Sequence, residues 1–174
     1  MRRVAVVGPG GAGKTTFSRE LGRRLGLPVV HLDEHYWQPG WTAIAETAWP
    51  ALQARLVAGE RWIVDGNYGS TLDIRLARAD TVVVFAPPRL VCLAGALRRS
   101  LGRRGEAVQA PGCPERVSGE FLRWIWRFAA DSRPRVDAAV ERHRGHLHVV
   151  ELRSRAAAAA FLDDLAEPRD APGA

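Results

Sequence analysis

The clearest pattern along the chain is a set of five short apolar segments, rich in valine and separated by longer stretches of mixed composition. Apolar runs without polar alternation are typical of strands that are buried on both faces of a parallel sheet. The predicted strands span residues 2–8, 28–32, 61–65, 80–86 and 146–152. We therefore expect one sheet with both faces covered.

Between the strands, apolar positions recur at the spacing of an α-helix. After Lys14, one helical face carries Phe17, Leu21 and Leu25, and Gly26 is a stop signal. Further helices are predicted at 46–58, 89–101, 120–132, 133–144 and 155–167, the fourth being either a continuation of the third or a separate helix. Strands that alternate with helices predict an open, parallel α/β sheet in a single domain over residues 1–174.

Two segments carry no helical or strand pattern. Residues 102–118 are rich in glycine, proline and charge, so we expect a long loop there, and loops of this length in compact domains are usually functional or disordered. Residues 167–174 are predicted to fray.

Composition places the chain among ordinary globular proteins, with 47% hydrophobic and 25% charged residues. No segment approaches the roughly 20 apolar residues of a membrane span, and the N-terminus lacks a signal-peptide pattern. We therefore expect a cytoplasmic protein without a membrane partner. Cys92 and Cys113 are expected to be free thiols.

The net charge of +6 indicates anionic partners, either nucleic acid or phosphate-bearing small molecules. The 25 basic residues comprise 24 arginines and a single lysine, Lys14. Such a skew indicates codon bias toward arginine, so the charge is weak evidence for nucleic acid. We do not expect nucleic-acid binding, and the lone lysine calls for a specific explanation.

Residues 8–15, GPGGAGKT, match the phosphate-binding motif G-x-x-x-x-G-K-[ST] between a predicted strand and a predicted helix. The glycines allow positive φ angles and let successive backbone N–H groups surround a phosphate. Lys14 is a compact cation for the β- and γ-phosphates, and the Thr15 hydroxyl is a ligand for Mg²⁺. The alternative is a glycine-rich turn with an accidental lysine. The predicted residues of the ATP site are Gly8, Pro9, Gly10, Gly11, Ala12, Gly13, Lys14, Thr15 and Thr16.

Five segments together resemble the adenylate-kinase-like group of P-loop phosphotransferases, and more closely the bacterial P-loop proteins called DNA topology modulation proteins. They are GPGGAGKTT, HLDEHYWQPGW, RWIVDGNYGSTLDIRL, ADTVVVFAPPR and GCPERVSGEFLRWIWRF, and the resemblance runs to about residue 154. It implies a five-stranded parallel sheet in the order 2-3-1-4-5 and a mobile lid that carries arginines. It also implies an acceptor site between the second and third strands, in a monomer or dimer.

Polar residues after the second strand are predicted to form the acceptor site. Asp33 lies where related kinases often place the carboxylate that accepts the proton of the acceptor hydroxyl, so we expect it to act as a general base or as a group that orients the hydroxyl. Tyr36 and Trp37 provide aromatic surface for the acceptor, and Trp41 either joins them or closes the core beneath a loop.

Asp65 ends the third strand and is predicted to hold a water on Mg²⁺ or to contact the acceptor. Adenylate kinases follow the corresponding Asp-Gly with Phe-Pro-Arg, whose arginine binds the acceptor phosphate. Here Asn67 and Tyr68 take the first two places as candidate acceptor contacts, and a glycine takes the third. This departure argues against a nucleoside monophosphate acceptor. Arg75 either replaces the missing arginine or is a solvated helix residue.

Histidines form two groups, which raise the alternative of a metal centre. His31 and His35 are four residues apart, but we expect no helix there and find no third ligand. A second group lies at residues 143–148. We expect both groups to satisfy hydrogen bonds instead.

Arginines flank the predicted lid on both sides, where related kinases carry cations that clamp the triphosphate. The candidates are Arg98, Arg99, Arg103, Arg104, Arg127, Arg133 and Arg135. Ser154 and Arg155 are predicted, by position alone, to contact adenine. The segment 121–128, FLRWIWRF, is predicted to be an apolar helix face in the core rather than a surface that stacks on nucleic-acid bases.

The leading prediction is an ATP- and Mg²⁺-dependent kinase that transfers the γ-phosphate to a hydroxyl or phosphate of a small-molecule or nucleotide-like acceptor. The alternative is a DNA-associated ATPase or regulator, as the name of the similar proteins implies, although no helix-turn-helix signal or polybasic tail is found. A GTPase is disfavoured, because the guanine-binding signature Asn-Lys-x-Asp is missing from the sequence.

Overall fold

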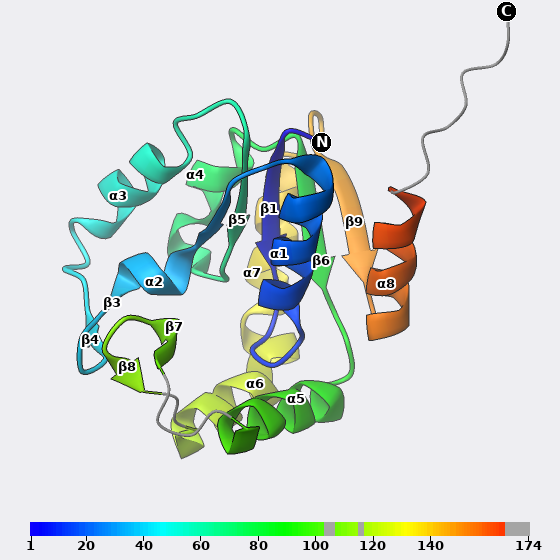
Figure 1. Ribbon diagram of the computed structural model, residues 1–174. Helices are drawn as coiled ribbons and strands as arrows, with labels where there is room; N and C mark the ends of the chain where they lie inside the picture. Colours follow the sequence, from blue (N-terminus) through cyan, green and yellow to red (C-terminus); the bar gives the residue numbers. More distant parts are fainter. Residues whose placement is uncertain (103–106, 115–116, 166–174) are drawn as a thin grey trace, which may run out of the picture.

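The computed structural model describes residues 1–102, 107–114 and 117–165. Its centre is a sheet of five parallel strands in the order β2-β5-β1-β6-β9 (Figure 1). The strands are β1 (Arg3–Val7), β2 (Val29–His31), β5 (Trp62–Asp65), β6 (Thr81–Phe85) and β9 (His148–Leu152). Numbered in chain order, this arrangement is 2-3-1-4-5, which confirms the predicted sheet and the α/β fold class.

The longer helices lie where the apolar spacing predicts them. They are α1 (Lys14–Leu25), α3 (Trp49–Leu56), α5 (Arg89–Gly102), α6 (Gly119–Asp131), α7 (Arg133–Arg142) and α8 (Arg155–Asp164). α1 ends at Gly26, whose φ of 61° is the left-handed conformation that stops a helix. α7 is a separate helix rather than a continuation of α6. Over the described residues, no helix combines the length and apolar character needed to cross a bilayer.

Alternate residues of the central strand β1 enter two separate cores, one on each face of the sheet. Val4 and Val6 pack with α1, α5, α6 and α8. Ala5 and Val7 pack with α3, α7 and the short helix α4 (Leu72–Leu76). The sheet is therefore held between two layers of helices, which leaves the carboxyl ends of its strands for a binding site.

The helix α6 packs as its apolar spacing predicts. Ile125 and Phe128 are buried in the core, and Phe121 is half-buried on the same face. Trp126 lies on the outer face, where the Arg89 guanidinium covers its ring at 3.8 Å from the centroid. The buried face is thus the apolar stripe, as the spacing requires.

Short elements that the sequence pattern does not predict follow β2 and β5. They are α2 (Leu32–Tyr36), β3 (Trp37–Gln38), β4 (Thr42–Ala43), η1 (Gly69–Thr71) and α4. The expectation of no helix around residues 31–35 is wrong, because α2 begins directly after β2. Its first turn carries Asp33 and Glu34, whose charges favour the N-terminal end of a helix. A helix this short produces no readable apolar periodicity.

The segment 102–118 contains a hairpin where the sequence predicts an irregular loop. β7 (Ala107–Ala110) pairs antiparallel with β8 (Cys113–Pro114), and Gly112 at the turn has a φ of 71°. Strands this short leave no alternation to read in the sequence. Residues 103–106 and 115–116 of the predicted lid, and the tail at 167–174 predicted to fray, lie outside the described residues.

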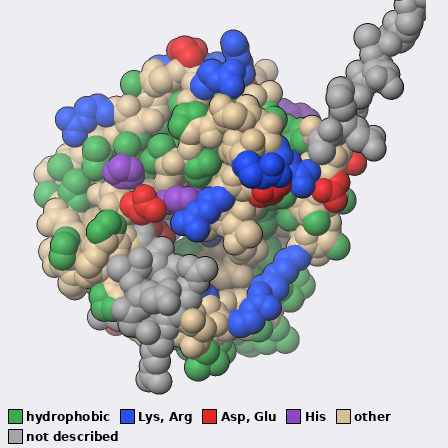
Figure 2. Space-filling model, in the orientation of Figure 1, with side chains coloured by type: hydrophobic (Ala, Val, Ile, Leu, Met, Phe, Trp, Pro, Cys, Tyr) green, Lys and Arg blue, Asp and Glu red, His purple; other side chains and the backbone are tan. Residues whose placement is uncertain are grey.

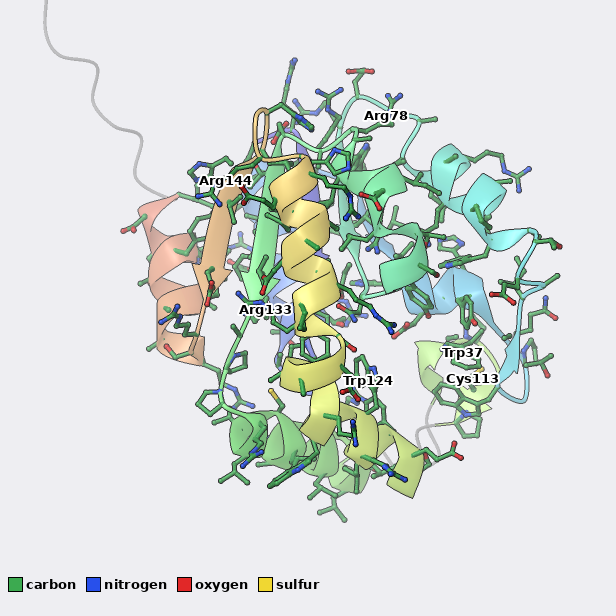
Figure 3. All side chains as sticks on the ribbon, turned by 180° about the vertical axis from the view of Figure 1, so that it is seen from behind. Trp37, Arg78, Cys113, Trp124, Arg133 and Arg144 are labelled. Atoms are coloured by element: carbon green, nitrogen blue, oxygen red, sulfur yellow. The ribbon has the colours of Figure 1, made fainter. Side chains whose placement is uncertain are left out.

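The hairpin β7–β8, which we call the lid hairpin, is bound to the hairpin β3–β4 (residues 37–43), which we call the arm. The Gly40 N–H donates to the Gly112 carbonyl at 3.0 Å. The Cys113 thiol donates to the Gln38 carbonyl at 3.1 Å, and Figure 3 shows this junction at Cys113. Two segments that are distant in the sequence thus meet on one side of the sheet.

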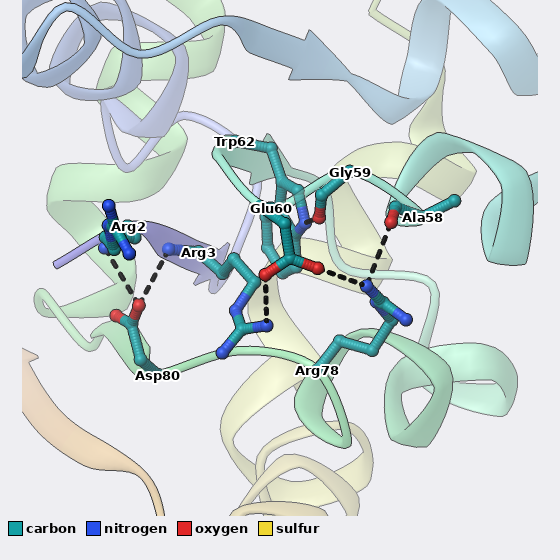
Figure 4. A network of polar contacts seen from close by, with 8 residues as sticks. All are labelled: Arg2, Arg3, Ala58, Gly59, Glu60, Trp62, Arg78 and Asp80. Atoms are coloured by element: carbon teal, nitrogen blue, oxygen red, sulfur yellow. Dashed lines mark hydrogen bonds and ion pairs between the residues drawn. The ribbon is translucent and has the colours of Figure 1, made fainter.

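A polar network joins the amino-terminal ends of β1 and β6, at the end of the sheet opposite the phosphate-binding motif (Figure 4). The Asp80 carboxylate accepts hydrogen bonds from the backbone N–H groups of Arg2 (2.8 Å) and Arg3 (2.9 Å). Burial opposes ionisation of Asp80, but bonds from the Thr81 hydroxyl and these N–H groups hold its pKa below the ordinary value. The exposed Glu60 pairs with Arg3 at 3.2 Å.

Candidate active site

The phosphate-binding loop connects β1 to α1 at the carboxyl end of the central strand (Figure 1). Gly8, Gly11 and Gly13 have φ angles of 141°, 73° and 94°, which other residues rarely adopt. A Cβ on Gly11 would overlap the Cys92 carbonyl oxygen of α5, so this position has no room for a side chain. The loop therefore has the geometry of a phosphate cradle, with the N-terminus of α1 behind it.

The helix α6 supports the same loop from one side. The rings of Phe121 and Trp124 leave no room for a side chain on Gly10, and the two rings stack with their centroids 5.9 Å apart. Pro9 and Ala12 are buried in the loop. The loop conformation is thus fixed by packing as well as by its own glycines.

Lys14 and Thr15 begin α1 beside this loop, followed by the exposed Thr16. The Lys14 ammonium donates to the Pro9 carbonyl at 2.9 Å. The Thr15 hydroxyl donates to the Asp65 carboxylate, at the end of β5, at 2.9 Å. The structure thus brings together the two residues predicted for the metal site. A hydroxyl and a carboxylate oxygen are donors that Mg²⁺ accepts, so the residues present fit this ion.

His31 is a residue of the site that the sequence marks only as a candidate metal ligand or as a histidine that satisfies local hydrogen bonds. It ends β2, and its register partner on β5 is Asp65. Its Nδ1 lies 3.2 Å from the Asp65 carboxylate, and Arg19 Nε donates to its Nε2 at 3.4 Å. Because Nε2 accepts, the ring proton lies on Nδ1 and is donated to Asp65, which fixes the direction of that carboxylate. Two polar residues that end adjacent strands are the sequence signal for this pair.

The other histidines make no metal cluster over the part of the chain that the structure describes. His143 Nε2 lies 3.0 Å from the Asp73 carboxylate, and His146 Nε2 lies 3.0 Å from the Leu76 carbonyl. These contacts connect the end of α7 to α4. His35 is exposed on α2.

Asp33 lies half-buried in the first turn of α2. The Tyr68 hydroxyl donates to its carboxylate at 2.6 Å. Burial raises the pKa of Asp33 above its ordinary value, while the Tyr68 hydrogen bond and the positive charges of Lys14 and Arg99 oppose that rise. Burial and the Asp33 charge also raise the pKa of Tyr68, so the phenol remains a donor. A carboxylate with a raised pKa beside a phosphate site is suited to accept a proton.

Four aromatic side chains beside Asp33 pack against one another. We call them the aromatic wall, and they are Tyr36, Trp37, Trp49 and Tyr68. The ring centroid of Tyr36 lies between 4.7 and 5.0 Å from the other three centroids. Trp49 begins α3 and is only 4% exposed. Trp49 is not predictable from the sequence as a member of this wall, because a tryptophan in a predicted helix is indistinguishable from a core residue.

Trp41 belongs to the junction of the arm and the lid hairpin. Its indole donates to the Pro114 carbonyl at 3.1 Å, and its ring centroid lies 5.5 Å from that of Trp37. It is half-buried and has a φ of 64°, which is rare for a residue other than glycine. Trp41 belongs to neither of the two buried clusters, so the alternative that it closes the core is wrong.

Arg75 is neither solvated nor exposed toward an acceptor. Its side chain is fully buried, with hydrogen bonds to the carbonyls of Gly66 (2.6 Å), Asn67 (3.3 Å) and Tyr68 (3.1 Å). Burial lowers its pKa to about 10, which leaves it protonated at neutral pH. The prediction of a solvated helix residue is wrong, because α4 directs this side chain beneath the loop that follows β5. Arg75 holds that loop in place.

Two of the predicted lid arginines have carboxylate partners. Arg127 is exposed on α6 and pairs with Asp131 at 2.7 Å. Arg133, labelled in Figure 3 at the start of α7, pairs with Asp137 at 2.6 Å and with Glu151 at 3.1 Å. A triphosphate would have to replace these carboxylates, so their role as a clamp stays a prediction.

The remaining predicted arginines lie near the end of α5 or beyond it. Arg98 is exposed and Arg99 is half-buried, and the charge on Arg99 reaches Asp33, since it lowers the pKa of that carboxyl. Arg103 and Arg104 lie outside the described residues, and Arg135 is exposed on α7.

Ser154 and Arg155, predicted to contact adenine, begin α8. The Ser154 hydroxyl accepts a hydrogen bond from the Ala157 N–H at 3.0 Å and so caps the helix. A Cβ on Gly95 would lie 3.5 Å from an Arg155 guanidinium nitrogen, so Arg155 runs along α5 close to the phosphate-binding loop. An adenine contact by either residue stays a prediction.

The surface is hollowed near the centre of the face shown in Figure 2, close to where Figure 1 places the loop before α1. Acidic, basic and histidine side chains lie along the rim of this hollow. The arrangement places a phosphate cradle, a donor pair for Mg²⁺ and a candidate proton acceptor at one end of the sheet.

No family model matches the chain, and no curated protein sequence matches it. Solved structures do match. A shikimate kinase from Acinetobacter baumannii in complex with shikimate is 17% identical, with a TM-score of 0.55, over 95% of this chain and 90% of that chain. A gluconokinase from Sinorhizobium meliloti 1021 is 16% identical, with a TM-score of 0.55, over 95% of this chain and 93% of that chain.

A shikimate kinase from Bacteroides thetaiotaomicron is 15% identical, with a TM-score of 0.52, over 94% of this chain and 96% of that chain. Identities this low establish a common fold alone. The resemblance to DNA topology modulation proteins stays a prediction. The chain shares its fold with these two shikimate kinases and this gluconokinase.

Proposed function

We propose that this protein is an ATP- and Mg²⁺-dependent kinase that phosphorylates a hydroxyl group of a small molecule. One observation carries the proposal. The Asp33 carboxylate accepts a hydrogen bond from Tyr68 and lies within electrostatic range of Lys14 of the phosphate-binding loop, and burial raises its pKa. A phosphate site and a proton acceptor close together are what phosphoryl transfer to a hydroxyl needs.

In this reaction the acceptor oxygen forms a bond to the γ-phosphorus, and the bond between that phosphorus and the β-phosphate oxygen breaks. The hydroxyl proton goes to the Asp33 carboxylate, and ADP leaves. Lys14 and the backbone N–H groups of the loop stabilise the negative charge on the phosphate oxygens. Thr15 and Asp65 would hold Mg²⁺, directly or through water, and the ion would neutralise phosphate charge.

The similar structures support this proposal without establishing it. They are two shikimate kinases, one of them in complex with shikimate, and a gluconokinase. The donor ATP, the metal Mg²⁺ and the cytoplasmic setting are part of the proposal.

The test is a phosphoryl-transfer screen over nucleosides, nucleotides, sugars and hydroxylated antibiotics, read by ³¹P NMR and mass spectrometry. We expect one class of acceptor to gain a phosphate, and we expect Lys14→Ala and Asp33→Asn to lose that activity while remaining folded. Ala54→Ser, on the exposed face of α3, is a control that should keep it. Folded protein that binds ATP, phosphorylates nothing and hydrolyses ATP faster with DNA would contradict the kinase and favour the DNA-associated ATPase.

A further inference from the structure

The candidate proton acceptor Asp33 is supported from behind by the loop that follows β5. The Tyr68 hydroxyl in this loop donates to the Asp33 carboxylate at 2.6 Å, a distance typical of a hydroxyl that donates to a charged oxygen. Lys14 and Arg99 also interact electrostatically with Asp33, so Tyr68 is one of several groups around it. The direction of the carboxylate therefore depends in part on where the Tyr68 side chain is held.

Three hydrogen-bond donors hold the backbone of Tyr68. Its carbonyl accepts from Arg75 Nη2 at 3.1 Å, from the Thr71 hydroxyl at 3.3 Å and from the Thr71 backbone N–H at 3.2 Å. Its ring packs against the rings of Tyr36 and Trp49, with the centroids 4.7 and 4.9 Å away. The backbone bonds and the ring packing together fix where the hydroxyl lies.

Arg75 extends this support over the whole loop, because its two terminal nitrogens bind three successive carbonyls. Nη1 donates to the Gly66 carbonyl at 2.6 Å, and Nη2 donates to the carbonyls of Asn67 (3.3 Å) and Tyr68 (3.1 Å). The side chain is fully buried. A lysine carries the same charge at a single nitrogen, so it cannot occupy both positions of this planar fork.

The loop that Arg75 holds contacts α2 at a second point. A Cβ on Gly66 would lie 2.7 Å from the Cβ of Leu32, the residue directly before Asp33, and Gly66 has a φ of 154°. The loop thus meets the first turn of α2 through the backbone of Gly66 and through the hydroxyl of Tyr68. A shift of the loop would displace both contacts.

We propose that Arg75 is a positioning residue for phosphoryl transfer. By holding the carbonyls of residues 66–68, it places the Tyr68 hydroxyl on Asp33 and keeps that carboxylate turned toward the acceptor hydroxyl. The inference rests on the proposed kinase activity and adds to it a residue that acts through another side chain. Because Arg75 acts through Tyr68, the effects of the two residues on turnover are not independent.

The test is a double-mutant cycle on the phosphoryl-transfer reaction. Tyr68→Phe keeps the ring and removes the hydroxyl, and Arg75→Lys keeps a cation and removes the fork. We expect each change to lower kcat about tenfold at saturating ATP and acceptor, with little change in the KM of the acceptor, because a displaced proton acceptor slows the chemical step more than binding. In the double variant, Arg75→Lys should add less than about twofold to the loss caused by Tyr68→Phe.

Arg78→Lys is the matched control. Arg78 also donates to a backbone carbonyl, that of Ala58 at 2.9 Å, but in the network at the opposite end of the sheet (Figure 4). The same substitution there should leave kcat unchanged. Thr71→Val removes one donor to the Tyr68 carbonyl with little change in shape, and it replaces Arg75→Lys in every measurement if that variant does not fold.

NMR gives a measurement that does not depend on turnover. The chain has two tyrosines, Tyr36 and Tyr68, so ¹³C labelling at Cζ gives two signals, and Tyr68→Phe identifies the second. The Cζ shift responds to the hydrogen bond of the hydroxyl. We expect Arg75→Lys to move the Tyr68 signal toward its position in Asp33→Ala, where the carboxylate is missing, and Arg78→Lys to leave it in place.

The outcomes separate this inference from the proposed function. Losses of kcat that multiply in the double variant, or a Tyr68 signal that does not move in Arg75→Lys, would overturn the positioning role and leave the kinase intact. If no acceptor is phosphorylated, the kinase is refuted and the NMR signal decides alone. A signal that moves would keep Arg75 as the residue that places the Tyr68 hydroxyl on Asp33, and one that stays would overturn both.

Discussion

At the scale of single residues, the site is a small set of polar side chains at the ends of three adjacent strands. The P-loop residues, Asp33 and Asp65 are readable from the sequence, because a motif or a strand end marks each position. Arg75 and Trp49 are not readable in this way. Whether an arginine or a tryptophan in a predicted helix points into solvent, a site or a loop depends on tertiary packing, which the local pattern does not contain.

Asp33→Asn is expected to abolish phosphoryl transfer and to raise the free energy of unfolding at neutral pH. Burial raises the pKa of Asp33, so the folded state favours the protonated form, and this carboxyl costs stability once the pH rises through its raised pKa. Asparagine carries no charge, so it removes this loss of stability, and its side-chain oxygen still accepts a hydrogen bond from Tyr68. Chemical denaturation at pH 7 measures the free energy of unfolding of both proteins. A variant that is less stable than the unmodified protein would contradict the prediction.

The same shift predicts the pH profile of the unmodified enzyme. Because Asp33 must be ionised to accept a proton, kcat should fall as the pH is lowered, at a pH above the ordinary pKa of an aspartate, which is about 4. The measurement is kcat as a function of pH at saturating acceptor and ATP. If kcat falls only at or below the ordinary pKa of an aspartate, another group limits the reaction.

At the scale of elements, the sequence predicts the five strands and the longer helices because each spans several periods of its pattern. It fails at α2, at the arm and at the lid hairpin, where elements of two to five residues show no period. The junction of the arm and the lid hairpin depends on backbone carbonyls and on a glycine turn, and no residue type marks such contacts in the sequence.

Gly112→Ala is expected to separate the lid hairpin from the arm. Gly112 has a φ of 71°, and an added Cβ would lie 2.9 Å from the Pro39 side chain, so both the backbone and the contact would be strained. Hydrogen exchange of the backbone at residues 38–43 should become faster, about tenfold or more. Gly119→Ala is the matched control, because a Cβ there meets nothing within 4 Å. Unchanged protection in Gly112→Ala would show that the junction does not hold the arm.

Asp80→Asn tests the network that joins β1 to β6. Hydrogen bonds hold the pKa of Asp80 below its ordinary value, so its charge stabilises the fold above the unfolded pKa, and this contribution is lost as the pH falls through the folded pKa. We expect a loss of about 1–2 kcal/mol at pH 7 that shrinks below about pH 4. Glu60→Gln, which breaks only exposed ion pairs, should cost far less. A loss that does not depend on pH would exclude the charge as its cause.

At the scale of the whole molecule, the two ends of the sheet have different tasks. One end is closed by the Asp80 network, and the other carries the phosphate-binding loop, the aromatic wall and the two joined hairpins. This division follows from the parallel strands, because their carboxyl ends all lie at one end of the sheet. The position of the site is therefore predictable before any side chain is located.

Mg²⁺ and ATP together are expected to raise the melting temperature of the protein. A ligand at 100 times its Kd stabilises the folded state by about 2.7 kcal/mol, which corresponds to about 5–10 °C for a chain of this length. Chelation of Mg²⁺ with EDTA should remove most of the increase, and Lys14→Ala should remove nearly all of it. Differential scanning fluorimetry measures both, and an increase that survives in Lys14→Ala would place the nucleotide elsewhere.

The single lysine of the chain has a practical consequence. An amine-selective acylating reagent has one side-chain target in this protein, and that target is bonded to the carbonyl of Pro9 in the loop. The rate at which mass is added at Lys14 therefore reports how accessible this ammonium is to the reagent. A compound that binds at the loop should slow this labelling. Mass spectrometry can therefore rank candidate ligands by how strongly they protect Lys14, even before a reaction has been found.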